Sequence, residues 1–178
     1  MVNTIPVLQL VGYKRSGKTT LLTRLVHYFT HQRGFTIFTI KHHNGPFQFD
    51  REGSDSLAHR QAGAKATLLQ SPTGLALSMA HNCEQPLEEL INWVSALEPF
   101  DLILVEGYKF EPYPKLVLIR HMDQLALLNQ LSGVRGVVFH SRADHQAYVE
   151  GNLGPYPAFL FDQPTPLFHW IEKWVRQA

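Results

Sequence analysis

The sequence predicts an α/β protein built around a mostly parallel β-sheet. Strand-like apolar runs alternate with segments of helical periodicity over most of the chain, and a glycine-rich loop separates the first strand from the first helix. This alternation is typical of βαβ units, whose strands lie parallel. With 178 residues, of which 44% are hydrophobic and 17% charged, the chain has the size and composition of one soluble globular domain, expected to span residues 1–178.

The first part of the chain predicts two strands with a helix between them. Residues 4–12 are a continuous apolar run, as expected for a strand in the buried centre of a parallel sheet. Apolar residues at helical spacing begin at Leu22, and Gly34 lies where the helix would end. Residues 35–41 are rich in β-branched and aromatic side chains and form the second expected strand. This order indicates a right-handed βαβ unit.

The remaining elements follow from similar patterns. Residues 42–56 have turn residues and charges but no period, and loops of this length are often functional. The elements expected after this loop are a short helix near 54–63, a hairpin of strands 65–70 and 75–80, a helix at 85–97, strands at 100–107, 115–120, 133–140 and 156–162, and a closing helix at 166–177.

Charge and cysteine content exclude several classes of protein. Sixteen basic and fifteen acidic residues give a net charge of +1, so a nucleic-acid partner is not expected. Cys83 is the single cysteine, which excludes an intramolecular disulfide and favours a reducing compartment. No basic segment precedes the first apolar run, and no run reaches the roughly 18 apolar residues that span a bilayer. We expect a cytoplasmic protein with no membrane partner.

Residues 12–19, GYKRSGKT, have the Gly-x4-Gly-Lys-Thr spacing of a phosphate-binding loop. Gly12 and Gly17 allow backbone N–H groups to converge on phosphate oxygens, and Lys18 can reach the β- and γ-phosphates. The Thr19 hydroxyl can bind Mg²⁺, and the dipole of the following helix favours anions. The alternative is a glycine-rich turn with a surface lysine. Because the motif lies between an expected strand and an expected helix, the sequence predicts a P-loop nucleotide-binding domain.

Glu106 is the candidate acid near the metal. It follows the apolar run LILV at the end of an expected strand, the place where P-loop proteins present a carboxylate. Aspartate is usual there, so the longer Glu106 can bind the metal, act through water, or act on the attacking nucleophile. An ordinary acid at a strand end is the alternative. Gly107, the next residue, can allow the backbone to approach a γ-phosphate closely.

The second expected strand ends in a lysine and two histidines. If this strand is parallel to the first, Lys41 lies on the same edge as the phosphate loop and can offset phosphate charge. His42 and His43, with Asp50 or Asp55, can bind a metal, an anion or a base. Adjacent histidines point in opposite directions in extended chain, so a site using both is geometrically unfavourable. Solvated loop residues are the open alternative for both.

A motif for reading the base is less distinct. Many guanine-specific P-loop proteins have Asn-Lys-x-Asp after a late strand, which this chain lacks. Residues 141–144, SRAD, follow an expected strand in what reads as a polar loop. Arg142 and Asp144 take the positions of the lysine and the aspartate, and Asp144 can accept hydrogen bonds from guanine N1–H and the 2-amino group.

Four motifs together resemble the MobB family, molybdopterin-guanine dinucleotide biosynthesis protein B. They are GYKRSGKTTLL, KHH at the second strand end, GSDS followed by AGA at 62–64, and DLILVEGYK at 101–109. The resemblance covers the first 120 residues or so in motif order. The residues it assigns to the nucleotide and metal site are Gly12, Tyr13, Lys14, Arg15, Ser16, Gly17, Lys18, Thr19, Thr20, Lys41, His42, His43, Asp55, Glu106 and Lys109.

The resemblance implies a three-layer P-loop NTPase fold and a function. It implies Mg²⁺-dependent GTP binding, weak GTPase activity, and a homodimer that shares an antiparallel extension of the sheet. It further implies help in attaching GMP to molybdopterin, together with the guanylyltransferase MobA. Lys18 and Glu106 would be the catalytic residues, and Thr19 and Glu106 the metal ligands. Hydrolysis is expected to be slow because no arginine finger is evident, although Arg15 lies within the loop.

Three other functions remain open. A small-molecule kinase would need an acceptor site and usually a basic lid, but the arginines are dispersed. A metallochaperone GTPase is suggested by the ten histidines, although there is no His-rich run and no Cys-x-x-Cys. A pure binding module would hold GTP for a partner and never hydrolyse it usefully.

Overall fold

The chain divides into two compact units, which are described separately. The computed structural model describes residues 5–43, 45, 50–81 and 83–177. Unit 1 comprises Met1–His42 and Leu87–Ala178, and unit 2 comprises His43–Pro86. That the two units form one domain stays a prediction. None of the described helices is long and apolar enough to cross a membrane.

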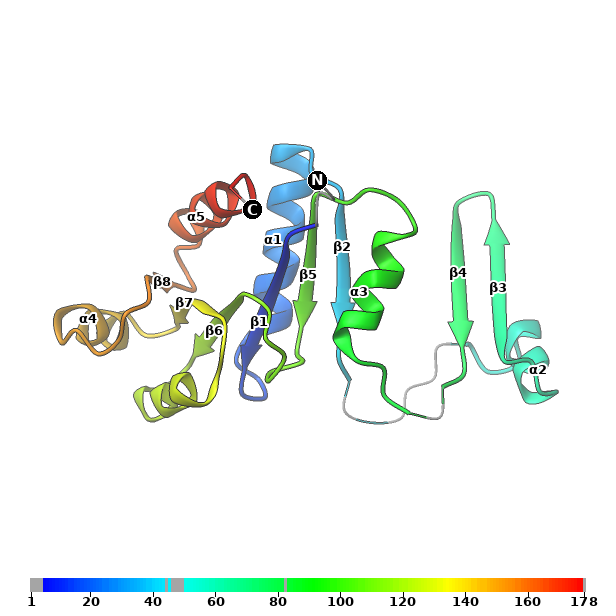
Figure 1. The fold of residues 1–178 in the computed structure, drawn as a ribbon, viewed down its shortest axis with the longest axis horizontal. Coiled ribbons are helices and arrows are strands. Elements are labelled where there is room, and N and C mark those ends of the chain that lie inside the picture. The colour runs from blue at the N-terminus through cyan, green and yellow to red at the C-terminus, as the bar shows by residue number, and fades with distance from the viewer. Residues whose placement is uncertain (1–4, 44, 46–49, 82, 178) are drawn as a thin grey trace. The chain divides into compact units, whose positions relative to one another are not determined.

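Unit 1 is built on a six-stranded sheet in which every strand pair is parallel (Figure 1). The strands are β1 (Val7–Gly12), β2 (Ile37–Lys41), β5 (Leu102–Glu106), β6 (Lys115–Ile119), β7 (Val134–Phe139) and β8 (Ala158–Leu160). Their order is β2-β5-β1-β6-β7-β8, so β5 lies between the two strands of the first βαβ unit. The predicted parallel sheet is confirmed, and the carboxyl ends of β1, β2 and β5 meet at one edge.

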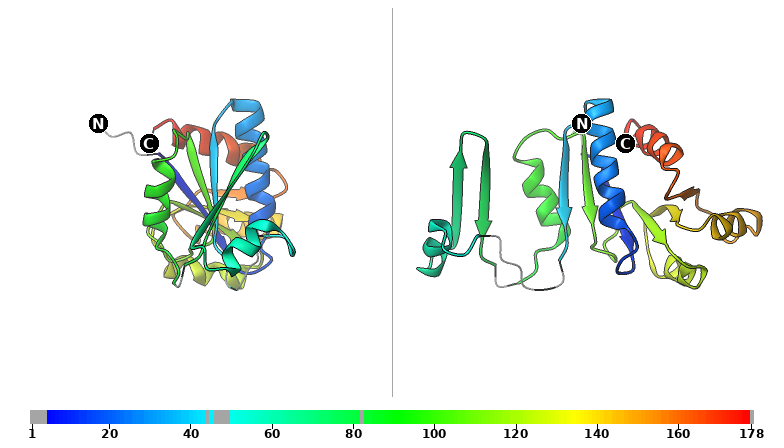
Figure 2. Two further views of the ribbon diagram at one scale, coloured as in Figure 1. Left: turned by 90° about the vertical axis from the view of Figure 1, so that its right-hand side faces the viewer. Right: turned by 180° about the vertical axis from the view of Figure 1, so that it is seen from behind.

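Helices cover both faces of this sheet and complete the three predicted layers. Helices α1 (Lys18–Arg33) and α5 (Thr165–Val175) pack on one face. The other face carries α3 (Leu87–Ser95), the 3₁₀ helix η1 (Met122–Gln130) and α4 (Arg142–Glu150). The left view of Figure 2 shows α1 and α3 on opposite sides of the strands.

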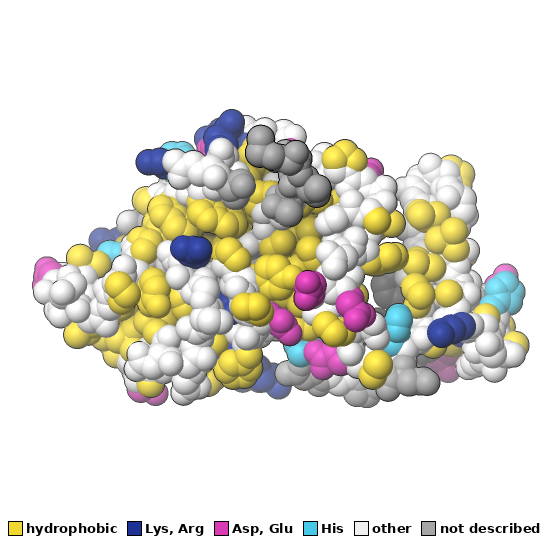
Figure 3. Space-filling model, viewed as in Figure 1, with side chains coloured by type: hydrophobic (Ala, Val, Ile, Leu, Met, Phe, Trp, Pro, Cys, Tyr) yellow, Lys and Arg dark blue, Asp and Glu magenta, His cyan; other side chains and the backbone are white. Residues whose placement is uncertain are grey.

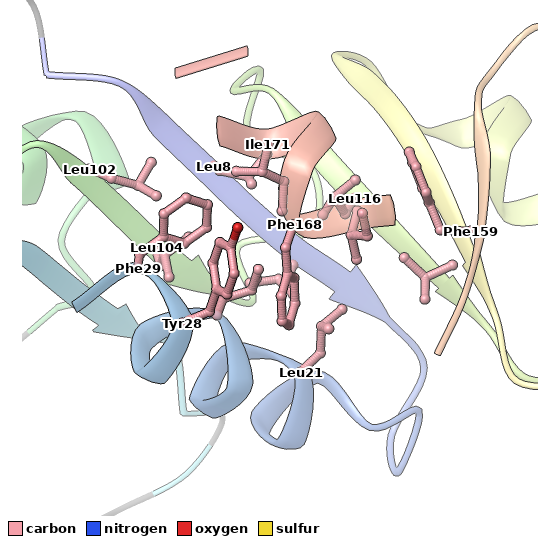
Figure 4. Close-up of a cluster of buried hydrophobic side chains, with 14 of the residues drawn as sticks. Leu8, Leu21, Tyr28, Phe29, Leu102, Leu104, Leu116, Phe159, Phe168 and Ile171 are labelled. Atoms are coloured by element: carbon pink, nitrogen blue, oxygen red, sulfur yellow. The ribbon is translucent and has the colours of Figure 1, made fainter. Parts of the chain in front are cut away.

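The core explains why the central strands read as continuous apolar runs. Successive residues of a strand point to opposite faces, and here both faces are buried. Leu8 and Leu10 of β1 pack on the side of α1 and α5, whereas Val7 and Val11 pack on the other side. Figure 4 shows the first of these clusters, in which side chains of α1 and α5 meet Leu8, Leu102, Leu104 and Leu116.

Unit 2 contains the predicted short helix and hairpin. Ser54 is the N-cap of helix α2 (Asp55–Gln61), and its hydroxyl accepts a hydrogen bond from the Leu57 N–H at 3.3 Å. Strands β3 (Ala66–Ser71) and β4 (Gly74–Met79) pair antiparallel. Arg60 joins helix and hairpin, since its guanidinium lies 2.6 Å from Asp50 Oδ2 and 2.9 Å from Ser78 Oγ.

Two helices of unit 1 do not follow from the sequence patterns. Residues 141–144 are not a polar loop, because α4 begins at Arg142 and Ser141 is its N-cap, accepting from the Asp144 N–H at 3.2 Å. Tyr148 is the buried residue of α4, and a single buried side chain does not create an apolar period. Helix η1 has 3₁₀ geometry, whose period of about three residues differs from that of an α-helix.

Candidate functional site

The predicted phosphate loop lies at the carboxyl edge of the parallel sheet. It starts where β1 ends at Gly12 and runs into the first turn of α1 at Lys18. Gly17 has φ 84°, a left-handed conformation that favours glycine. A Cβ there would lie 2.9 Å from the Phe161 ring and 3.1 Å from the His140 ring. The loop therefore needs glycine at position 17 for both its backbone conformation and its packing.

Lys18 is folded back over the loop that precedes it. Its ammonium group donates to the carbonyl of Tyr13 at 2.8 Å and to that of Gly12 at 3.2 Å. Burial lowers the pKa of Lys18 below its ordinary value, Glu106 opposes this shift, and the charges of Lys109 and Lys41 add to it. The loop thus holds a partly desolvated cation beside its own backbone, where phosphate oxygens would bind it strongly.

Thr19, Glu106 and Lys41 form a connected polar group beside the loop. The Thr19 hydroxyl donates to Glu106 Oε1 at 2.7 Å. The Lys41 ammonium lies 3.4 Å and 3.3 Å from the two Glu106 carboxylate oxygens and 3.4 Å from Thr19 Oγ1. Glu106 is 9% exposed, so its charge is largely removed from water and Lys41 balances it. Parallel pairing of β2 with β5 sets Lys41 opposite Glu106.

The donor set of this group fits magnesium. A hydroxyl and a carboxylate are hard oxygen ligands, which Mg²⁺ prefers together with phosphate oxygens and water. Thr19 and Glu106 would hold the ion, which when bound would neutralise phosphate charge. In the structure, Lys41 is the cation that contacts these oxygens. Within the described ranges, no group of three or more His, Cys, Asp or Glu residues could hold a metal by itself.

The segment that follows β5 brings further predicted residues to the loop. Gly107 has φ 105°, and a Cβ there would lie 2.8 Å from His42 Cβ. Its N–H donates to the carbonyl of Leu10 at 3.2 Å, within the sheet. His42 stacks on Tyr108 with the ring centres 4.5 Å apart. The Lys109 ammonium lies 4.7 Å from the centre of the Tyr13 ring, which brings a further lysine to the phosphate loop.

Two buried polar residues that sequence analysis missed hold this segment. Gln9 of β1 and Lys115 of β6 are each 0% exposed and lie opposite each other in the sheet. The Gln9 amide donates to the carbonyls of Tyr108 at 2.8 Å and Gly107 at 3.2 Å. The Lys115 ammonium donates to the carbonyls of Lys109, at 3.3 Å, and Glu111. A glutamine inside an apolar strand was the available signal.

Burial also affects the charge of Lys115. Removal from water lowers the pKa of its ammonium group, while the nearby charge of Glu111 opposes the shift. Together with Gln9, this lysine donates hydrogen bonds to the carbonyls of Gly107, Tyr108, Lys109 and Glu111. The segment that contains Lys109 is therefore held from beneath by side chains of two neighbouring strands.

Two further residues missed from the sequence hold the phosphate loop from the opposite side. His140, directly after β7, has Nε2 2.8 Å from the carbonyl of Ser16. Its ring stacks on Phe161 with the centres 4.1 Å apart. Arg120, directly after β6, donates to the carbonyl of Arg15 at 2.8 Å. Their position after strands near β1 is the signal that could have identified them.

The structure brings together most, but not all, of the predicted site residues. In the loop, Tyr13, Lys14 and Arg15 are exposed and Ser16 is buried, and Thr20 is exposed on the first turn of α1. Arg15 has φ 62°. Of the other predicted residues, His43 and Asp55 belong to unit 2, and Asp144 lies in the first turn of α4. Their roles at the nucleotide stay predictions.

Comparison with known proteins gives a consistent result. A family model described as molybdopterin guanine dinucleotide synthesis protein B matches residues 7–139. A protein of Bacillus subtilis named probable molybdopterin-guanine dinucleotide biosynthesis adapter protein is 31% identical over 167 residues, which cover 93% of this chain and 91% of that protein. A molybdopterin-guanine dinucleotide biosynthesis adapter protein of Haemophilus influenzae is 36% identical over 125 residues, which cover 67% of this chain and 66% of the relative.

A solved structure extends the similarity to the later part of the chain. The crystal structure of a MobB protein homologue from Bacillus stearothermophilus has a TM-score of 0.72 and 30% sequence identity to this chain. The match covers 97% of this chain and 99% of that one. It therefore includes the region after residue 139, for which the sequence motifs gave little support.

Proposed function

The chain belongs to the MobB family, and from this premise we propose that it is a GTP-binding adapter in molybdopterin-guanine dinucleotide biosynthesis. The family predicted from the four sequence motifs is thereby confirmed. A role as an adapter in this biosynthesis follows from the family and from the named relatives. GTP as the ligand, Mg²⁺ as the ion and a guanylyltransferase as the partner are the further content of the proposal.

One observation carries the proposal of triphosphate binding. Side chains from three different elements converge at the carboxyl edge of the sheet, where Thr19 contacts Glu106 at 2.7 Å and Lys41 contacts both. Lys18 lies in the loop beside them. An acid, a hydroxyl and two lysines next to a helix N-terminus match the charges of a metal-bound triphosphate. A surface lysine in an ordinary glycine turn would have no such neighbours.

The residues of this site have distinct tasks in the proposed mechanism. Lys18 and the loop N–H groups bind phosphate oxygens, and Lys41 and Lys109 add positive charge. Thr19 and Glu106 would hold a bound Mg²⁺, and Glu106 would also orient water. Arg15 is exposed and lies within the loop, so it contacts solvent or phosphate. Because it does not act as an arginine finger, hydrolysis is slow. The protein thus holds GTP long enough to act with a partner enzyme.

The proposed partner is the guanylyltransferase MobA, with molybdopterin as the group that receives GMP. An adapter that binds GTP beside this enzyme would raise the local concentration of nucleotide at the acceptor. Hydrolysis is then not required for function, which keeps the alternative of a pure binding module within the same proposal. The slow-GTPase version and the binding-module version of the proposal predict different effects of replacing Glu106 on support of the conversion.

We also propose that the chain forms a homodimer through the hairpin of unit 2. Leu68, Leu75, Leu77 and Met79 lie on one face of β3 and β4, and they are 59%, 64%, 38% and 46% exposed. Figure 3 shows hydrophobic side chains gathered on this hairpin. A two-stranded sheet is marginally stable alone, and an exposed apolar face of this kind is typical of an interface. A second copy of the hairpin would cover it with an identical face.

Nucleotide binding is tested by calorimetry with GTP and ATP, each with Mg²⁺. We expect tight binding of GTP, and a loss of at least about tenfold in Lys18→Ala, because a charge-assisted hydrogen bond to phosphate is removed. Lys173→Ala is the matched control, since Lys173 is exposed on α5. Equal affinity of the wild-type protein for GTP and ATP would contradict the proposal of a guanine nucleotide.

The adapter role is tested by reconstituting conversion of molybdopterin to its guanine dinucleotide with purified guanylyltransferase. We expect the wild-type protein to raise the yield and Lys18→Ala to fail. Glu106→Gln separates the two versions of the mechanism. If this variant binds GTP, does not hydrolyse it and still supports the conversion, the protein acts as a binding module. Loss of support together with hydrolysis would show that hydrolysis matters.

A further inference from the structure

A groove of about 600 Å³ begins beside the phosphate loop and runs along α1. One side is formed by exposed residues of α1, among them Thr20, Thr23 and Arg24, and the other by Pro164 and Phe168 at the start of α5. We infer that this groove holds the ribose and base of the nucleotide whose phosphates the loop binds. The inference rests on the proposed function and adds to it the location of the nucleoside.

The position of the groove follows from the geometry of α1. Lys18 and Thr19 are the residues assigned to the triphosphate, and Thr19 and the next residue, Thr20, both line the groove. Residues 20, 24 and 27 share one face of the helix, at spacings of four and three. With a rise of 1.5 Å per residue, His27 lies about 10 Å beyond Thr20. This stretch of helix offers space for a ribose and a base directly after the α-phosphate.

The lining of the groove suits an aromatic base with polar edges. The half-buried Pro164 presents apolar surface, and Phe168 adds the edge of a ring that is 8% exposed and packs on Tyr28 with centres 4.7 Å apart. Base faces stack on surfaces of this kind. Arg24 donates one N–H to the carbonyl of Phe161 at 2.9 Å, and a guanidinium has five such donors. The others can bind O6 and N7 of guanine, two acceptors that adenine does not offer together.

This location differs from the one that residues 141–144 predicted. Asp144 lies in the first turn of α4, which packs on the opposite face of the sheet from α1 and α5. It is not among the residues that line the groove. If the base lies in the groove, substitutions that fill the groove weaken its binding and substitution of Asp144 does not. If the base lies at residues 141–144, the reverse is expected.

The test fills the groove without changing the phosphate loop. Thr23 is exposed on α1 and lines the groove, so Thr23→Trp would occupy the space proposed for the nucleoside. Thr30→Trp is the matched control, because Thr30 is exposed on the same helix, two turns further from the loop, and does not line the groove. Both variants and the wild-type protein are titrated with GTP and with inorganic tripolyphosphate, each with Mg²⁺, and circular dichroism verifies folding.

We expect Thr23→Trp to weaken GTP binding by about 10- to 100-fold, the range for loss of a stacked base, and to leave tripolyphosphate binding unchanged. Thr30→Trp should bind both ligands as the wild type does. Unchanged GTP affinity in Thr23→Trp, or equal losses for both ligands, would overturn the inference. So would a selective loss of GTP in Asp144→Ala.

Two further outcomes are distinguishable from these. If the wild-type protein binds neither GTP nor tripolyphosphate, the proposed function itself fails and the groove with it. If Thr23→Trp does not fold, His27→Trp makes the same test, since His27 is exposed and lines the groove. A loss of GTP affinity without a loss of tripolyphosphate affinity in that variant supports the inference, and unchanged affinity for both refutes it.

Discussion

At the residue scale, Lys41 and a bound Mg²⁺ would compete for the same oxygens. The ammonium group lies 3.3 to 3.4 Å from Thr19 Oγ1 and from both carboxylate oxygens of Glu106. A divalent ion that binds Thr19 and Glu106 must therefore displace this contact. Lys41 is more than half exposed, so its side chain has room to move outward.

We predict that Lys41→Met lowers the Mg²⁺ concentration needed for half-maximal GTP binding. The reason is that the ion no longer competes with an ammonium group for Glu106. Titration of Mg²⁺ at fixed GTP measures this directly, with Lys14→Met as a control for loss of one exposed loop lysine. A higher Mg²⁺ requirement in Lys41→Met would mean instead that the charge Lys41 contributes to phosphate binding outweighs its competition with the ion.

The burial of Lys115 predicts how the free energy of unfolding depends on pH. Burial lowers its pKa below the ordinary value of 10.5, so the folded protein releases this proton at a lower pH than the unfolded chain does. Between those two pKa values the unfolded chain binds more protons, and the free energy of unfolding rises with pH. We expect Lys115→Met to lack this contribution. Urea denaturation at several pH values up to 10.5 measures the difference, and parallel curves for the two proteins would contradict the prediction.

Some residues of the site could be predicted from the sequence, and others could not. The roles of Lys18 and Glu106 were predictable because their chemistry is tied to a spacing and a strand end. Gln9 and Lys115 were not identified, because their importance depends on which carbonyl groups they reach in the folded protein. Arg120 likewise contacts Arg15, a residue 105 positions away. Contacts of this range have no local pattern.

At the element scale, the phosphate loop depends on the packing of Gly17. We predict that Gly17→Ala lowers the free energy of unfolding by about 1–3 kcal/mol and weakens phosphate binding, because a Cβ would force Phe161 or His140 to move. Gly34→Ala is the matched control. Gly34 also has a left-handed φ, 70°, but no atom lies within 4 Å of the added Cβ.

Thermal denaturation and tripolyphosphate binding of both glycine variants separate strain from packing. The Gly34→Ala variant should lose about 1 kcal/mol from backbone conformation alone and keep its phosphate affinity. If Gly17→Ala behaves like Gly34→Ala, the contact of Gly17 with Phe161 has no role in forming the loop.

Strands were more predictable than helices at this scale, for a physical reason. The central strands are buried on both faces and therefore read as apolar runs, and every expected strand of unit 1 is present. Helix α4 buries one side chain, Tyr148, so its pattern is that of a polar loop. The first residues of several strands were placed too early, since β2 begins at Ile37 and β8 at Ala158. Apolar side chains continue into the connections there.

At the scale of the whole molecule, the exposed apolar face of the hairpin is the surface through which we propose that two copies associate. We predict that Leu68→Lys with Leu77→Lys converts a dimer into a monomer, because these residues lie opposite each other on the exposed face of β3 and β4. Light scattering after gel filtration measures the mass. Thr73→Lys, in the turn between the strands, is the control.

Two outcomes would contradict the proposed dimer. One is a monomeric wild-type protein at micromolar concentration, and the other is a double variant that keeps the mass of a dimer. The sequence predicted the hairpin itself from two short strands around a turn. It did not predict the division into two units, because no linker or low-complexity segment separates them.

The strand order has a consequence for anyone who wishes to redesign this protein. Because β1 lies between β5 and β6, the two sides of the phosphate loop have different neighbours. Arg120 and His140, after β6 and β7, hold the backbone of the loop, whereas Glu106 and Lys41, at the ends of β5 and β2, supply the charges beside it. The charges proposed to bind the ion can therefore be changed on one side while the scaffold on the other side is left untouched.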